Sequence, residues 1–203
     1  MTDSAASIAA DIAVNIEMRL ESLRLPELAG PLRDWPLAPV PRSVRAGSAA
    51  TLPVLSWLPQ IGRDAGTWAA EIVSAVCGSA AALAWHQTYR ESEIGRSFLD
   101  NYAYTEIMGT RGPLASERIA CGFLLLGPAT RYPRHRHEAE ELYVPLSGTA
   151  SWQRGDSQWR DHAPGTPIHH ASEEPHAMRT GPAPLLALYV WWNADLDESA
   201  RLG

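Results

Sequence analysis

The sequence predicts a mainly β protein in which a C-terminal β-barrel follows an α-helical N-terminal region. After Asn101, short apolar and β-branched runs alternate with glycine and proline. Several short strands at close spacing are typical of an antiparallel sandwich or barrel. We expect residues 1–95 to form the helical region with a proline-rich connection, and residues 96–203 to form the barrel. The expected strands are 119–126, 141–146, 149–153, 167–170 and 185–192.

The N-terminal region carries two helical patterns separated by prolines. The first 25 residues repeat isoleucine and leucine at helical spacing, and Pro26 marks the expected end of that helix. Seven prolines between residues 26 and 59 predict an extended, wrapping connection in place of a regular element. An alanine-rich stretch predicts a second helix from residue 64 to about residue 89.

Composition and net charge limit the kinds of partner that we expect this protein to bind. The formal net charge of −6 argues against nucleic-acid binding, which usually needs a basic face. The N-terminus lacks the basic and apolar regions of a secretory signal, and the apolar-leaning segment 68–85 is interrupted by polar residues. We therefore expect a cytoplasmic protein with no membrane partner. Cys77 and Cys121 lie in apolar surroundings and are expected to be buried free thiols.

A metal-binding pattern stands out in the second half of the chain. His135 and His137 are two residues apart, so on a strand they point to the same face, and Glu141 either continues in phase or returns from an adjoining bend. Two imidazoles and a carboxylate suit a divalent transition metal. A further ligand is expected from later in the chain, where His176 follows Pro175.

The spacing His135-x-His137-x3-Glu141-x6-Gly148 resembles the first cupin motif, although its usual leading glycine is replaced by Ala129. The second motif departs further, since a long insert separates Pro164-Gly165 from His176. With that insert, the stretch from about 99 to 196 resembles the cupin-type dimethylsulfoniopropionate (DMSP) lyases. The matching segments are Phe98–Tyr102, Gly122–Pro128, Tyr132–Tyr143, Pro164–His170, Pro175–Thr180 and Pro184–Tyr189.

The resemblance implies a C-terminal cupin barrel (a double-stranded β-helix, or jelly-roll) and a defined chemistry. Enzymes of this family cleave DMSP to dimethyl sulfide and acrylate by β-elimination. The implied cofactor is one divalent ion of Zn, Fe, Mn, Co or Ni, which polarises the substrate carboxylate. The implied ligands are His135, His137, Glu141 and His176. Tyr143 is the implied base, and Tyr132 is expected to hold the substrate or assist proton transfer.

Aromatic residues are the expected wall of the substrate pocket. Tyr102, Tyr104, Trp191 and Trp192 could present π faces to the cationic sulfonium of DMSP, although core packing is the favoured interpretation for each one taken singly. His169 and His170 are adjacent, so on a strand only one can face the pocket, and we assign His169 to it.

Three alternatives remain open at this stage. A relative with the same metal and tyrosine would act on another β-substituted propionate, because a fold does not choose the substrate. An iron-dependent cupin dioxygenase or isomerase would use the same ligand set, and a non-enzymatic cupin would only bind a ligand. The N-terminal helix and proline-rich arm are candidates for a homodimer contact or for a cover over the barrel.

Overall fold

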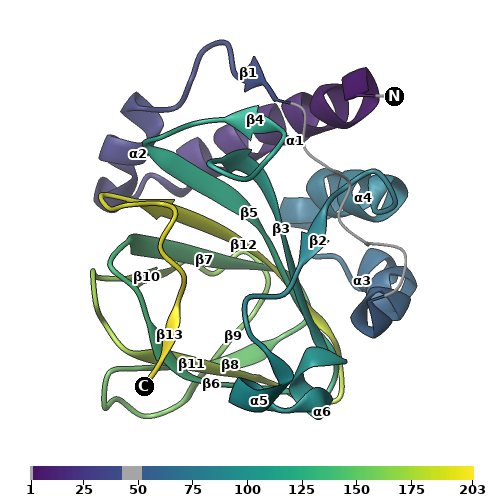
Figure 1. Ribbon diagram of the computed structural model, residues 1–203, viewed down its shortest axis with the longest axis vertical. Helices are drawn as coiled ribbons and strands as arrows, with labels where there is room; N and C mark the ends of the chain where they lie inside the picture. The colour runs from purple at the N-terminus through teal and green to yellow at the C-terminus, as the bar shows by residue number, and fades with distance from the viewer. Residues whose placement is uncertain (1, 43–51) are drawn as a thin grey trace.

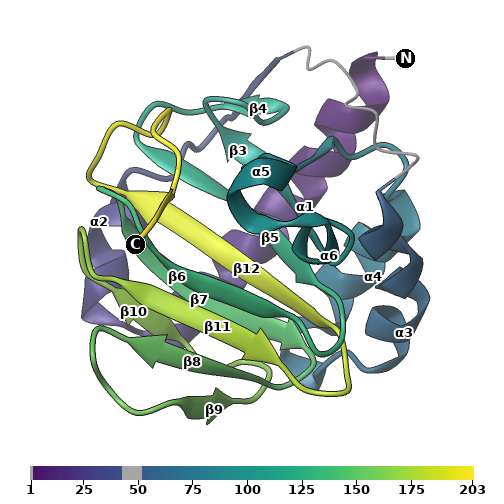
Figure 2. The same ribbon diagram turned by 60° about the horizontal axis from the view of Figure 1, so that its bottom comes forward.

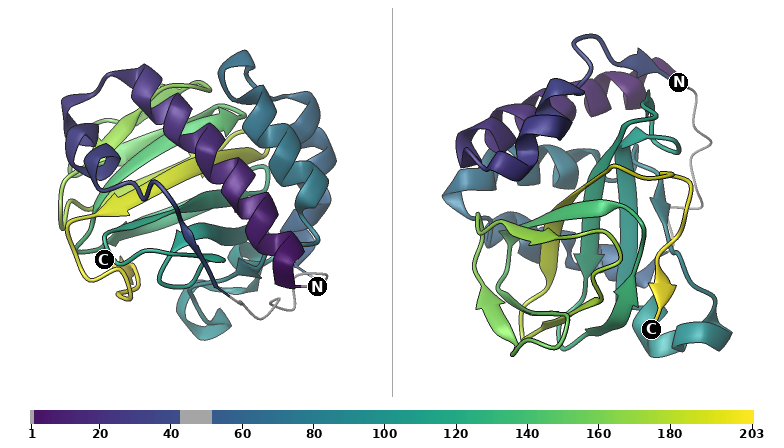
Figure 3. Two further views of the ribbon diagram at one scale, coloured as in Figure 1. Left: turned by 90° about the horizontal axis from the view of Figure 1, so that it is seen from above. Right: turned by 90° about the vertical axis from the view of Figure 1, so that its left-hand side faces the viewer.

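The computed structural model describes residues 2–42 and 52–203, and of residues 2–4 it describes the backbone alone. Two β-sheets face each other, and helices cover the outer face of the larger sheet (Figure 1). Seen from above, the N-terminal helix crosses that outer face obliquely (Figure 3). The predicted arrangement of a jelly-roll barrel with a helical N-terminal region is confirmed.

The larger sheet has eight strands and the smaller sheet five. Within the described residues, all strand pairs are antiparallel except the parallel pair of β3 and β4. In spatial order the larger sheet consists of β1 (Val40–Pro41), β4 (Leu114–Ala115), β3 (Tyr102–Gly109), β5 (Ile119–Leu126), β12 (Leu185–Trp192), β7 (Glu140–Ser147) and β10 (Ile168–His170), with β2 (Trp85–His86) beside β3. The smaller sheet consists of β13 (Arg201–Leu202), β6 (Arg131–Arg136), β11 (His176–Thr180), β8 (Ala150–Arg154) and β9 (Arg160–His162), and is seen in Figure 2.

The five strands expected from sequence are all present, each with ends within one residue of the prediction. Four further strands of three or more residues were not predicted. They are β3, β6, β9 and β11. His135 lies in β6, but the strand ends at Arg136, and the chain turns at His137 before β7 begins. Glu141 therefore does not continue the strand of His135. It comes from β7, the next strand along the chain, as the alternative with an adjoining bend predicted.

The N-terminal half agrees with the sequence only in part. The first helix, α1, spans Thr2–Leu23 as expected. The second expected helix is shorter than predicted, because α4 covers only Ala70–Ser79 and the chain then turns to pair β2 with β3. The remaining helices are α2 (Ala29–Arg33), α3 (Leu58–Arg63), α5 (Glu91–Ile94), α6 (Arg96–Leu99) and the 3-10 turns η1 (Pro26–Leu28), η3 (Pro53–Trp57) and η4 (Thr67–Ala69).

The proline-rich connection is not simply extended, which corrects the sequence-based expectation. Prolines occupy the first turn of η1, η3 and α3, where a missing N–H costs nothing because that group has no intrahelical partner. The part of the predicted connection over residues 43–51 lies outside the described residues. None of the helices described is long and apolar enough to cross a membrane. Cys77 is half-buried and Cys121 is buried, and both are free thiols as expected.

Along the strands of the larger sheet, successive side chains point alternately into two apolar clusters, one on each face of the sheet. On β7, Leu142 and Val144 pack against the helices, whereas Tyr143 packs inside the barrel. The outer cluster also contains Ile12 and Ile16 of α1, so the helices and the outer face of the sheet share one core. Because side chains alternate with period two, Glu141 shares the inner face with Tyr143.

A close backbone approach explains the glycine that ends the first motif. Gly148 follows β7 with φ at +82°, a conformation that residues with a Cβ rarely adopt. A Cβ at this position would lie 2.1 Å from the carbonyl oxygen of Pro184. The glycine thus lets β7 end against the start of β12, the strand next to it.

Candidate active site

Three strands bring the four predicted metal ligands to one place inside the barrel. His135 of β6 lies opposite His176 of β11 in the smaller sheet, while Glu141 comes from β7 in the larger sheet. His137 lies in the turn between β6 and β7. All four side chains are buried, with Glu141 0% exposed. Buried polar groups of this kind require partners, since an unpaired one costs free energy.

Three of the four form a compact group. The potential ligand atoms of His137, Glu141 and His176 all lie within 4.8 Å of one another. Nε2 of His137 is 3.1 Å and Nε2 of His176 is 3.2 Å from Oε2 of Glu141. His135 lies outside this group, although its ring centroid is 4.2 Å from that of His176. The structure thus offers a potential metal site in which Glu141 is central.

Backbone carbonyls orient all three imidazoles in the same way. Nδ1 of His135, His137 and His176 each lies 2.9 Å from a carbonyl oxygen, to which its N–H can donate. When the rings are neutral, the lone pair of each is then on Nε2, which is the tautomer that suits a metal ligand. Nε2 of His176 is buried and makes no hydrogen bond within the described residues. These orientations fit a bound divalent ion.

The neighbours of Glu141 stabilise its ionised form and orient its carboxylate. Burial opposes ionisation, but the adjacent imidazoles of His137 and His176 hold the pKa of Glu141 well below its usual range. Burial by itself would lower the pKa of His137, and the Glu141 carboxylate instead raises it. Trp191 donates its indole N–H to Oε1 of Glu141 over 2.6 Å. One carboxylate oxygen is thus oriented by Trp191, and the other faces the imidazoles.

Tyr143 and Tyr132 lie beside this group. The ring of Tyr143 is 6.4 Å from that of His176, and the ring of Tyr132 stacks on His135 at 3.9 Å with an interplanar angle of 10°. The hydroxyl groups of Tyr132 and Tyr89 are 2.8 Å apart and share a hydrogen bond. Burial raises the pKa of both Tyr143 and Tyr132 well above the ordinary value, and the Glu141 carboxylate raises that of Tyr143 further.

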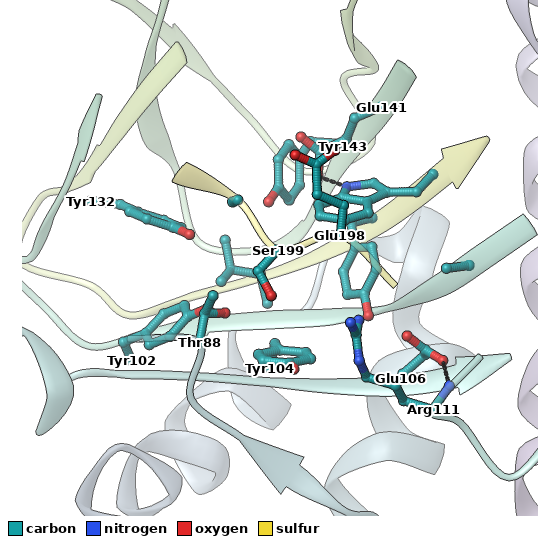
Figure 4. Close-up of a pocket in the computed structure, with 15 residues that line it drawn as sticks. Thr88, Tyr102, Tyr104, Glu106, Arg111, Tyr132, Glu141, Tyr143, Glu198 and Ser199 are labelled. Carbon is teal, nitrogen blue, oxygen red and sulfur yellow. Dashed lines mark hydrogen bonds between the residues drawn. The ribbon is translucent and has the colours of Figure 1, made fainter. Parts of the chain in front are cut away.

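A cavity opens from this cluster towards the larger sheet (Figure 4). The predicted residues Tyr102, Tyr104 and Trp191 are on its wall, together with Glu141. Sequence reasoning missed other wall residues, including charged ones. Among them are Thr88, Tyr189, Glu106, Arg111 and Glu198. The period-two spacing of Tyr102, Tyr104 and Glu106 is the signal that would have placed Glu106 on the same face of one strand.

The two adjacent histidines of β10 point in opposite directions, and the assignment of His169 to the pocket is not supported by its position. Nε2 of His169 is 3.2 Å from Glu140, and its ring stacks on Trp192, away from the cavity. His170 faces inward instead, fully buried, with its ring stacked on His176 at 4.0 Å. Neither ring nitrogen of His170 has a hydrogen-bond partner within the described residues.

Comparison with known proteins agrees with this geometry. The chain is 36% identical over 133 residues to dimethylsulfoniopropionate lyase DddQ of Ruegeria pomeroyi, a match that spans 66% of each chain. It is 36% identical over 115 residues to the putative dimethylsulfoniopropionate lyase DddL of Cereibacter sphaeroides, covering 56% of this chain and 47% of that protein. The matches thus span about half to two thirds of the length of these relatives.

The tertiary structure extends the similarity over the whole chain. The crystal structure of DMSP lyase DddQ from Ruegeria pomeroyi DSS-3 superimposes with a TM-score of 0.82 and 31% identity, over 99% of this chain and 97% of that chain. The family model for dimethylsulfoniopropionate lyase matches residues 38–187. The chain therefore belongs to the DMSP lyase family.

Proposed function

We propose that this protein is a carbon–sulfur lyase that cleaves DMSP to dimethyl sulfide and acrylate by β-elimination. The observation that carries the proposal is the oriented group of His137, Glu141 and His176 beside the phenol of Tyr143, at the end of an aromatic cavity. The names of the relatives support the substrate, and the geometry supports the chemistry.

His137, Glu141 and His176 would hold a divalent metal ion, and His135 is the proposed fourth ligand. His135 has the same Nδ1 orientation as the other two imidazoles and lies beside His176. When bound, such an ion supplies Lewis-acid stabilisation of the negative charge that develops on the substrate carboxylate. The histidine and carboxylate set accepts several divalent ions, so zinc, iron, manganese, cobalt and nickel are all to be tested.

Tyr143 is the proposed general base. Its phenol oxygen would remove a proton from the carbon beside the substrate carboxylate. The electron pair of that C–H bond forms the carbon–carbon double bond of acrylate, and the electron pair of the C–S bond leaves on sulfur as neutral dimethyl sulfide. In the absence of a nearby cation the raised pKa keeps Tyr143 protonated, so positive charge near the phenol is required for it to act as a base.

Tyr132 is proposed to position the substrate or pass on the proton. Its hydroxyl is paired with that of Tyr89, and its ring is fixed against His135. Tyr102, Tyr104 and Trp191 give the cavity an aromatic wall, and a π face attracts a cationic head group with roughly 0.5–2 kcal/mol.

Dimethyl sulfide release tests the proposal directly. The purified protein is stripped of metal, reloaded with each candidate ion in turn, incubated with DMSP and assayed for headspace dimethyl sulfide. Tyr143→Phe should retain the bound metal and the melting temperature but lose about 10²- to 10⁴-fold in kcat, the usual contribution of a positioned base. Absence of dimethyl sulfide from every metal-loaded form would reject the lyase function, and oxygen consumption in its place would favour a cupin dioxygenase.

A further inference from the structure

One buried carboxylate of the cavity has no part in the chemistry described so far. Glu106 lies on β3, is 5% exposed, and lines the same cavity as Glu141. In Figure 4, Glu141 lies at the top of the group of side chains drawn, and Glu106 lies at its lower right, beside Arg111. The β3–β5 pairing shifts register between Glu106 and Met108, and a bulge of this kind re-aims a side chain.

Two backbone N–H groups bind the carboxylate of Glu106. Oε1 accepts the backbone N–H groups of Arg111 at 2.6 Å and of Gly112 at 2.7 Å. The turn comes this close because Gly109, with φ at +148°, has no Cβ; a Cβ there would lie 2.5 Å from Oε1. Within the described part of the chain, Oε2 of Glu106 has no hydrogen-bond partner. One oxygen is therefore fixed, and the other is left for a ligand.

Among the described residues, Arg111 is the one cationic side chain on the cavity wall, and it is already engaged. The guanidinium of Arg111 donates to the carbonyl oxygens of Leu196 and Asp197 and lies 4.0 Å from the Asp197 carboxylate. Arg111 therefore faces the segment that follows β12. Burial raises the pKa of Glu106 although Arg111 and Arg42 both act to lower it. The phenol rings of Tyr104 and Tyr189 share the cavity with Glu106. A carboxylate among aromatic rings is the environment that suits an organic cation.

We propose that Glu106 is a specificity-determining residue that recognises the cationic head group of a zwitterionic substrate whose carboxylate end lies at the His137–Glu141–His176 group. This inference rests on the proposed function. A sulfonium neither donates nor accepts a conventional hydrogen bond, so it can be selected only by charge and by polarisable surroundings. Glu106 supplies the charge, and the phenol rings supply the surroundings.

The role of Glu106 has a kinetic signature. Breaking the C–S bond removes the positive charge, because the sulfur leaves as a neutral thioether. The attraction to Glu106 is therefore strongest for the bound substrate and weaker in the transition state and product. An interaction that is stronger in the bound substrate than in the transition state lowers KM and also lowers kcat, so its loss should raise KM and raise kcat together. The neutral product is also released more easily from this subsite than the substrate.

Glu106→Gln removes the charge of Glu106 and is expected to leave the fold unchanged. The amide oxygen of glutamine can still accept the two backbone N–H groups, so the 109–112 turn is kept while the charge is lost. The measurement is calorimetric binding to the metal-loaded protein of two carboxylates of the same shape, 3-(trimethylammonio)propionate and 4,4-dimethylpentanoate, whose tert-butyl head group carries no charge. We expect the wild-type protein to prefer the cationic ligand by about tenfold or more, which is about 1.4 kcal/mol. In the variant this preference should fall by at least about fivefold, and the part that remains is the contribution of the aromatic rings.

A matched control is Glu71→Gln, which removes the same charge from α4 outside the cavity, where the Glu71 side chain is 69% exposed and pairs with Arg19. Its preference should equal that of the wild type. Glu106→Asp keeps the charge, so it should still bind the cationic ligand more tightly than the uncharged one. This second variant keeps the inference testable if Glu106→Gln folds poorly. An unchanged cation preference in well-folded Glu106→Gln would overturn the inference.

The binding test also separates this inference from the proposed function. A Glu106-dependent cation preference in a protein that releases no dimethyl sulfide rejects only the elimination. Dimethyl sulfide release with the same KM in wild type and Glu106→Gln rejects only the subsite.

Discussion

Replacing Trp191 by phenylalanine tests whether the carboxylate of the candidate metal site depends on its indole neighbour. The indole N–H donates to Oε1 of Glu141 over 2.6 Å, and the Trp191 ring lies 4.2 Å from that of His137. Phenylalanine keeps an aromatic ring in this place but removes the donor. Glu141, which is 0% exposed, then retains its charge with one oxygen unpaired.

The expected cost follows from the kind of bond that is lost. A hydrogen bond to a charged group contributes about 1.5–3 kcal/mol, so the free energy of unfolding of the metal-free protein should fall by about that amount. In the metal-loaded protein, the freed carboxylate is less well oriented, and losing such an outer partner lowers metal affinity by about 10- to 100-fold.

Urea unfolding of the metal-free protein and competition with a metal chelator measure the two effects. Trp192→Phe is the matched control, because Trp192 is the next residue of β12, points to the opposite face, and makes no indole N–H hydrogen bond within the described residues. Its cost should be limited to lost apolar burial, about 1 kcal/mol. Equal unfolding midpoints and metal affinities for the two variants would refute the reasoning.

Two further predictions concern stability. Burial raises the pKa of Glu106, so its ionised form costs stability in the folded, ligand-free protein as pH rises through that pKa. Glu106→Gln should therefore unfold at higher urea concentration than the wild type near pH 7 and lose this advantage near pH 4; a constant difference across that range would contradict the assigned burial cost. Ile16→Ala removes a fully buried side chain between α1 and the sheet and should cost about 2–5 kcal/mol, whereas Val14→Ala, at a position 55% exposed on the same helix, should change stability by less than about 0.5 kcal/mol. Similar losses in the two helix variants, measured by thermal or urea unfolding, would mean that α1 does not pack as described.

The metal-ligand pattern could be predicted because it is local. His135, His137 and Glu141 lie within seven residues, and spacing limits how they can be arranged on two strands joined by a turn. The far partner, His176, was expected from its place after Pro175 later in the chain and from the family resemblance, and the pairing of β6 with β11 accounts for its position beside His135. The difference between His169 and His170 could not be decided, because which alternate residue faces inward depends on the strand to which β10 pairs.

The sequence by itself determined the first helix, five strands of the β-rich C-terminal half and the residue types for a metal site, because these follow from periodicity and short-range spacing. That the strands form a cupin barrel was implied by the resemblance to the family. Only the tertiary structure decided that the second helix is short, that β2 joins the sheet, and that Glu106 shares a cavity with Glu141. Those outcomes depend on contacts between segments far apart in the chain. A bulge in β3 and the glycine turn around Glu106 direct its charge into the cavity. Neither the bulge nor the turn can be read from local composition, since each exists only where one strand meets another.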